Sequence, residues 1–109
     1  MSNVIGAVKL RNAIKRIAPE LTIQLKNVRV NGAHFGCEGF VSDLASDRHV
    51  YVSTDHNHHT NSTGFFRRAA STSDYRGFEN HFAKLDAEVL AQGVVRLVRG
   101  EVIPTKFSL

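Results

Sequence analysis

Tryptophan is absent from this chain of 109 residues, and cysteine and methionine occur only once each. Without tryptophan, the bulky side chains of a core must come from seven phenylalanines and two tyrosines. The single cysteine, Cys37, has no second cysteine to pair with, so an internal disulfide is excluded. We expect Cys37 to be a small buried hydrophobic residue, because a reactive thiol needs a cationic and partly exposed setting.

Long apolar runs are missing too. No segment approaches the roughly 18 uninterrupted apolar residues that a membrane-spanning helix needs. Near the N-terminus, Lys9, Arg11, Lys15 and Arg16 interrupt every apolar run, which argues against a signal peptide. We therefore expect a cytoplasmic protein without a membrane partner.

Catalytic and nucleotide-binding signatures are likewise absent. The sequence has no glycine-rich phosphate loop, no dinucleotide fingerprint and no nucleophile elbow, and no spacing of Ser, His and Asp indicates a triad. A composition of 42% hydrophobic and 22% charged residues is typical of a globular domain. With no repeat and no linker, we predict a single domain over residues 1–109 that is not an enzyme.

What the chain does have is an uneven charge distribution within a net charge of +4. Residues 1–33 contain six basic residues and one acidic residue, a net charge of +5. Residues 34–64 contain one basic and four acidic residues, a net charge of −3, and also five of the six histidines. The sequence therefore predicts a polarised surface.

The basic segment opens with a helical pattern over residues 3–17. Apolar residues recur at i, i+3, i+4 and i+7 from Leu10 to Ile17, which places them on one face. Asn3 or the residue before it is the expected N-cap. Pro19 should end the helix, because a residue that precedes proline is disfavoured in the helical region.

A β-hairpin is expected next. Residues 21–30 alternate between apolar and polar until the phase slips, which predicts a strand with a β-bulge near residues 26–27. Asn31-Gly32 is typical of a type I′ turn, so the return strand should cover residues 33–44. The turn would pair Val30 with Ala33, Arg29 with His34, and Val28 with Phe35.

The second half is expected to supply a third strand over residues 48–54, a polar loop over 55–64 and a second helix over about 75–92. Residues 65–73 remain ambiguous. Ser73 is the expected N-cap of that helix and Gly93 its end, before a last strand over residues 94–99. The predicted fold class is α+β, a single small domain with an antiparallel sheet of about four strands and two helices in the order α-β-β-β-α-β.

A histidine-rich segment is the first candidate site. His56 and His58 would point the same way in an extended chain, with His59 and Asp55 beside them. Imidazole and carboxylate groups suit a divalent metal ion, although a catalytic site needs a third protein ligand. A solvated polar loop is the simpler interpretation, so we predict no cofactor and keep a metal-dependent hydrolase or nuclease as an alternative.

Basic residues form the second candidate site. If the fold gathers them on one side, they could neutralise several phosphates of a nucleic acid. We expect Tyr51 to be exposed on the third strand, where it would add a stacking surface for single strands. The predicted binding set is Lys9, Arg11, Lys15, Arg16, Lys26, Arg29, Tyr51, Arg67, Arg68 and Arg76.

These features favour a non-enzymatic binding domain that contacts nucleic acid, or a host nucleic-acid-binding protein complex, through a basic surface. The alternative is a small phage or mobile-element accessory protein that inhibits a host defence complex by protein–protein contact. Exposed strand edges and the C-terminal Phe107-Ser108-Leu109 leave a homodimer open.

Overall fold

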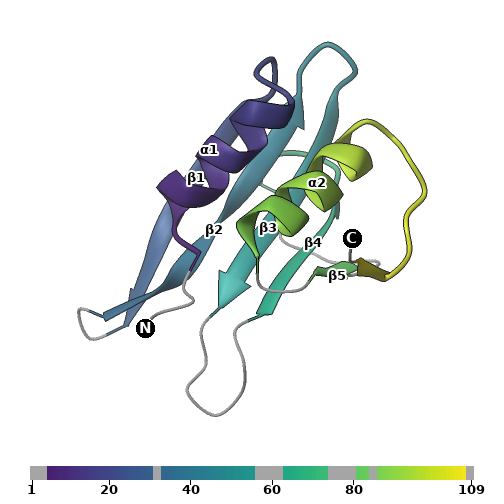
Figure 1. Cartoon of the computed structure of the whole chain (residues 1–109). Coiled ribbons are helices and arrows are strands. Elements are labelled where there is room, and N and C mark those ends of the chain that lie inside the picture. Colours follow the sequence, from purple (N-terminus) through teal and green to yellow (C-terminus); the bar gives the residue numbers. More distant parts are fainter. Residues whose placement is uncertain (1–4, 31–32, 56–62, 74–80, 84–85, 108–109) are drawn as a thin grey trace.

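Two layers make up the molecule, which we describe from a computed structural model covering residues 5–30, 33–55, 63–73, 81–83 and 86–107. Two helices lie side by side on one face of a six-stranded sheet whose strands follow their order in the chain (Figure 1). The elements are α1 (Ala7–Ile17), β1 (Thr22–Val30), β2 (Ala33–Asp43), β3 (Arg48–Asp55), β4 (Thr63–Ala69), β5 (His81–Ala83), α2 (Ala87–Val98) and β6 (Lys106–Phe107).

The predicted α+β class is confirmed. The first five strands pair antiparallel, where about four were expected, and the short β6 adds a parallel pairing to β5. In the part of the chain that the structure describes, neither helix has the length and apolarity needed to cross a bilayer.

Helix α1 ends before Pro19, as predicted. It begins at Ala7 after Gly6, which has no side chain to serve as a cap, and the expected cap near Asn3 lies outside the described residues. Instead, Asn27 of β1 accepts a hydrogen bond of 2.9 Å through Oδ1 from the N–H of Ala7. A strand side chain thus satisfies one of the N–H groups that a helix start leaves unpaired.

The β1–β2 hairpin has the predicted pairing next to its turn, and the turn itself lies outside the described residues. Farther along, Val28 pairs with Gly36 and not with Phe35, because the register shifts by one residue. The bulge is therefore in β2, and the prediction of a bulge near residues 26–27 is wrong. The change of phase in β1 needs no bulge. Alternate residues of a strand face opposite sides of the sheet, and this sheet buries apolar groups on both sides.

The predicted helix over residues 75–92 is confirmed over residues 87–92 and wrong over residues 81–83. Residues 81–83 form β5, and α2 begins only at Ala87. The N-cap is Asp86 rather than Ser73, and its carboxylate accepts hydrogen bonds from the backbone N–H groups of Glu88 and Val89. The ambiguous segment 65–73 contributes most of β4.

The predicted last strand over residues 94–99 is also wrong, because α2 continues to Val98. Gly93, the expected helix end, is buried inside the helix. Val94 and Val95 are buried as well, so burial against the sheet outweighs the β preference of these residues. Arg99 is the C-cap, and Gly100 follows it with a φ of +87° that suits glycine.

The main core lies between the helices and the sheet. It includes Leu10, Val52, Phe66 and Leu90, none of which exposes measurable surface. Cys37 is buried in this core, as predicted, and the burial raises the pKa of its thiol.

The opposite side of the sheet, here called the second face, carries Phe40, Tyr51, Phe65, Arg67 and Phe82. Their aromatic rings contact one another from strand to strand across β2, β3, β4 and β5. Phe40 and Tyr51 are buried here. The sheet therefore has packed aromatic groups on the side away from the helices.

Candidate nucleic-acid interface

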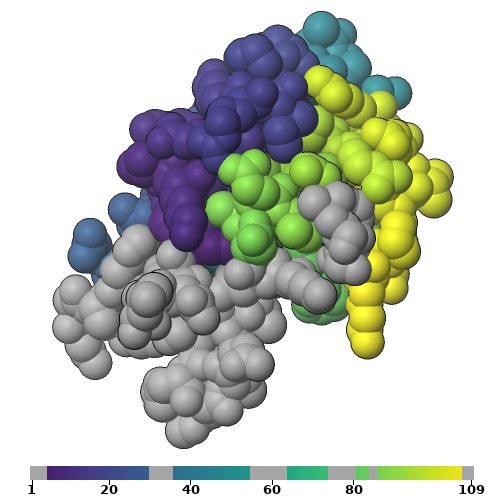
Figure 2. Space-filling model, viewed as in Figure 1, coloured from purple at the N-terminus to yellow at the C-terminus, as the bar shows by residue number. Residues whose placement is uncertain are grey.

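The outer side of α1 gathers four of the predicted binding residues, here called the α1 basic face: Lys9, Arg11, Lys15 and Arg16. All four are exposed, and the helix buries only its opposite side. Helix α1 contains no acidic residue. In Figure 2 the surface of α1, in purple, faces the reader and is not covered by another segment. Four positive charges are thus presented to solvent along three turns of one helix.

Two of these cations have contacts within the described residues. Arg16 forms an exposed ion pair with Glu88 in the first turn of α2. The Nζ of Lys15 lies 3.4 Å from the carbonyl oxygens of Pro19 and Leu21. Exposed pairs of this kind contribute little free energy, so they leave the charges available to a ligand.

Lys9 and Arg11 contact no acidic group among the described residues. They border Val8, whose residue surface is 56% exposed, and Asn12, which is also exposed. The surface between the cations is therefore neutral. A polyanion could approach it without displacing an existing ion pair at these two positions.

The two predicted residues of β1 lie on different sides of the sheet. Arg29 is exposed and shares its side of the sheet with Asn27, which contacts the start of α1, so it lies on the helix side of the sheet. Lys26 projects from the second face, with its Nζ 3.6 Å from Glu38. The structure thus places Arg29 on the same side of the sheet as α1 and Lys26 on the other.

Tyr51 is 7% exposed, so the expectation of an exposed stacking residue is wrong. The guanidinium carbon of Arg67 lies 4.3 Å from the centre of the Tyr51 ring, and Arg67 is also 7% exposed. The Tyr51 hydroxyl donates a hydrogen bond of 3.1 Å to Glu38. Burial is the main reason that the pKa of Tyr51 is raised, and this hydrogen bond raises the pKa further. Both residues pack on the second face, because that face has a core of its own, and they do not join the α1 basic face.

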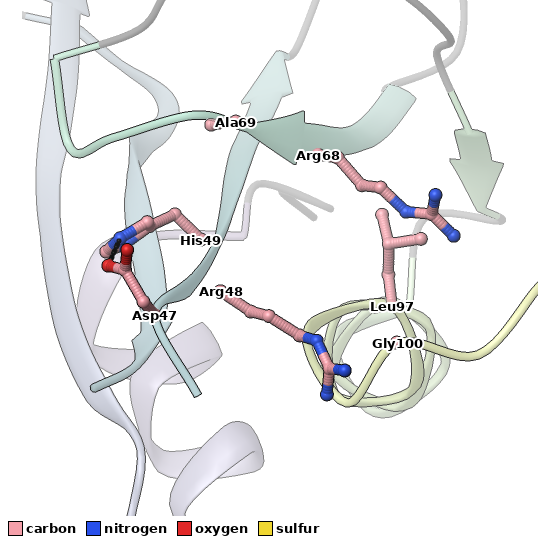
Figure 3. Close-up of a pocket in the computed structure, with 7 residues that line it drawn as sticks. All are labelled: Asp47, Arg48, His49, Arg68, Ala69, Leu97 and Gly100. Carbon is pink, nitrogen blue, oxygen red and sulfur yellow. Dashed lines mark hydrogen bonds and ion pairs between the residues drawn. The ribbon is translucent and has the colours of Figure 1, made fainter. Parts of the chain in front are cut away.

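Arg68 projects from the opposite side of β4, toward the end of α2, and is exposed. Its guanidinium donates to the carbonyl oxygen of Glu101 at 3.4 Å. Beside it, Arg48 donates to the carbonyl oxygen of Arg99 at 3.1 Å. Figure 3 shows Arg48 pointing to the end of α2 and Arg68 running past the Leu97 side chain. Both arginines line a cavity of about 340 Å³.

Sequence reasoning did not single out Arg48. The available signal was its position at the start of a predicted strand, but the strand that pairs with it could not be known from the sequence. Arg68 was predicted as part of a general basic surface, and the structure places it in a pair with Arg48.

The remaining predicted residues cannot be placed. Arg76, His56, His58 and His59 lie outside the described residues, and Asp55 is described only through its backbone in β3. Among the residues whose positions the structure gives, no three His, Cys, Asp or Glu side chains are grouped to hold a metal ion. The histidine-rich metal site therefore stays a prediction.

A chain of hydrogen bonds links Ser42, His49 and Asp47. The Ser42 hydroxyl lies 2.7 Å from Nδ1 of His49, and the other ring nitrogen lies 2.9 Å from Asp47. The residue types are those of a hydrolytic triad, but Ser42 is only 2% exposed. A buried hydroxyl cannot attack a substrate from solvent, so the chain satisfies polar groups of a packed sheet.

Comparison with protein-family models, with curated proteins and with solved structures finds no match to this chain.

Proposed function

We propose that this domain binds nucleic acid without catalysing a reaction, through the α1 basic face and Arg29. The observation that supports this proposal is the absence of any acidic residue from a helix that exposes four cations. Binding of phosphates releases condensed counterions, and this release makes the contact favourable at low salt.

Salt dependence gives the proposal a quantitative form. On duplex DNA, the slope of log K against log salt is about −0.9 for each neutralised phosphate. Five cations in contact, the four of α1 and Arg29, predict a slope of about −4.5, and a single strand would give about −3.5. A sequence-independent contact of this kind needs no base-reading side chain.

Fluorescence anisotropy with labelled duplex and single-stranded oligonucleotides, in roughly 50 to 200 mM salt, measures these slopes. The test variant is Lys9→Gln with Arg11→Gln, since neither side chain contacts an acidic group among the described residues. We expect this variant to reduce the duplex slope by about 1.8 in magnitude.

The matched control is Lys26→Gln with Lys106→Gln, which removes the same charge from positions away from α1. Lys26 lies on the second face and Lys106 in β6. Equal loss in the test and control variants would show that only net charge matters and would contradict the proposed surface. No binding of the unaltered protein at about 50 mM salt would contradict the function itself.

The second candidate is inhibition of a host complex that normally holds nucleic acid, by contact with an acidic protein surface. Exposed Val8, at the centre of the α1 basic face, favours it, because apolar area is what a protein partner buries. Val8→Ser separates the two: it should weaken a protein complex and leave the salt slope on oligonucleotides unchanged.

A further inference from the structure

Arg48 and Arg68 are close neighbours on adjacent strands. Arg68 pairs with Val50 across β3 and β4, so Arg48, two residues before Val50, is its diagonal neighbour on the same face. Diagonal neighbours have Cα atoms roughly 7–8 Å apart, within reach of long side chains. Two basic side chains therefore start from neighbouring positions on one face, at one end of the sheet.

Neither guanidinium has a carboxylate partner among the described residues. Each contacts only a neutral backbone carbonyl, that of Arg99 or Glu101. Elsewhere in the described part of the chain, three arginines of the helix layer do have acidic partners: Arg16 with Glu88, Arg96 with Glu101, and Arg99 with Glu20. The two arginines at the sheet end have no such partner among the described residues, so no described carboxylate balances their charges.

Capping of α2 accounts for only part of the hydrogen-bonding capacity of this pair. The N–H of Gly100 donates to the Leu97 carbonyl, and the N–H of Glu101 donates to the Arg96 carbonyl. This Schellman motif satisfies those two carbonyls, and Arg48 adds a bond to the carbonyl of the C-cap residue Arg99. A guanidinium has five N–H donors, and the contacts given above use one of each, which leaves donors for a ligand.

Gly100 lets Arg48 approach the backbone. A Cβ atom at this position would lie 2.9 Å from the guanidinium carbon of Arg48, too close for an ordinary contact. The guanidinium thus lies flat against the turn that ends α2.

The cavity beside the two arginines holds about 340 Å³, near the lower limit for small-molecule sites. Leu97 and Ala69 give it an apolar part. The acidic residue at its edge, Asp47, pairs with His49, and Figure 3 shows these two side chains turned toward each other, away from the guanidinium groups.

We propose that this cavity, the Arg48/Arg68 pocket, binds a phosphomonoester, with the phosphate between the two guanidinium groups. The planar N–H pairs of arginine match phosphate oxygens in bidentate geometry. A phosphomonoester carries about −1.5 to −2 charges at neutral pH, which balances two guanidinium groups. The source of the phosphate is a free mononucleotide or the 5′ end of a strand, and the pocket acts independently of the α1 basic face.

Titrations followed by the Nε–Hε signals of arginine in ¹⁵N NMR test this site directly. Adenosine 5′-monophosphate and a 5′-phosphorylated trinucleotide should shift the Arg48 and Arg68 signals in a saturable way. Adenosine and the 5′-hydroxyl trinucleotide should not. The tighter of the two phosphorylated ligands identifies the source of the phosphate. Shifts of equal size with adenosine, or no shift with either phosphorylated ligand, would overturn the proposal.

The variant Arg68→Gln should weaken adenosine 5′-monophosphate binding by roughly tenfold or more, because a charge-assisted hydrogen bond is lost. Arg68→Lys should recover only part of it, since a point charge cannot bind in bidentate fashion. The control is Lys26→Gln, which removes an exposed cation on the second face and should not change this affinity. Equal weakening by Lys26→Gln would overturn the pocket. The Lys9→Gln and Arg11→Gln variant should also leave the affinity unchanged, so failure of the α1 surface and failure of the pocket are distinguishable.

Discussion

Along β4, consecutive side chains enter different surroundings. Phe66 lies beneath the helices with no exposed surface, and its ring stacks on His81 with centroids 5.5 Å apart. The next residue, Arg67, is nearly as well buried, but on the second face and over the ring of Tyr51. One strand thus contributes to two cores of different composition.

The difference lies in the type of interaction. Beneath the helices, stability comes from apolar area and close packing, which are not directional. On the second face, the contacts have direction: a guanidinium over a ring, and Glu38 between the Tyr51 hydroxyl and the ammonium group of Lys26. We therefore expect the helix side to respond most to changes in volume, and the second face to changes in geometry and charge.

The largest effect is expected for Phe66→Ala. Removal of a fully buried phenylalanine should lower the free energy of unfolding by about 3–5 kcal/mol, measured by urea denaturation. The control is Phe82→Ala on the second face, where the residue is 46% exposed, and the loss should be clearly smaller. Equal losses of unfolding free energy in the two variants would show that the helix side of the sheet does not depend more on buried volume than the second face.

Thr54→Val tests a pair of buried hydrogen bonds beneath the helices. The Thr54 hydroxyl donates to the carbonyl of Ile5 at 2.7 Å and accepts from the N–H of Cys37 at 2.9 Å. Valine has nearly the same shape but leaves both backbone groups unpaired, so we expect a loss of about 1–3 kcal/mol. Thr54→Ser keeps the hydroxyl and should retain more of the stability; a valine variant as stable as the unaltered protein would show that the bonds contribute nothing.

The adjacent arginines of β4 sharpen the comparison further. Arg67→Lys keeps the charge on the second face but loses the planar group over Tyr51, which should cost about 1–2 kcal/mol by urea denaturation. Arg68→Lys makes the same change at an exposed position on the other side and should cost less than about 0.5 kcal/mol. If Arg68→Lys lowered the free energy of unfolding more than Arg67→Lys, it would contradict the finding that Arg67 is buried and Arg68 is exposed.

The elements that the sequence predicted well have a clear local pattern. Helix α1 has an apolar stripe ending near Pro19, and the residues flanking Asn31-Gly32 pair as the turn requires. Strand β4 was ambiguous because both of its sides are packed, so Phe65-Phe66-Arg67-Arg68 shows no alternation of apolar and polar residues.

Helix α2 was misplaced for a related reason. The spacing of Phe78, Phe82 and later apolar residues suits a helix, but Phe82 belongs to β5. The valines near the end of α2 favour a strand locally, and only the tertiary burial of nearly the whole helix determines otherwise. The candidate sites differ in the same respect. The sequence could predict the basic face of α1 from its periodicity, whereas the Arg48/Arg68 pair depends on strand pairing that the sequence does not reveal.

The smallest effect is expected from pH, with one titrating group on each side of the sheet. Burial raises the pKa of Cys37, beneath the helices, above its ordinary value of 9.0. Burial and the Glu38 contact raise the pKa of Tyr51, on the second face, above its ordinary value of 10.0. In both cases the unfolded chain loses its proton first, so above the ordinary pKa the folded state binds more protons.

Stability should therefore fall as pH rises, first through Cys37 from about pH 9 and then through Tyr51 from about pH 10, by at most about 1.4 kcal/mol per pH unit for each group. Urea denaturation between about pH 8 and 11 should show that Cys37→Ala removes the earlier part of this loss and Tyr51→Phe the later part. If the Tyr51→Phe variant loses stability above pH 10 as steeply as the unaltered protein, the hydroxyl is not held in a buried contact, and the second face would lack the directional core that distinguishes it from the helix side.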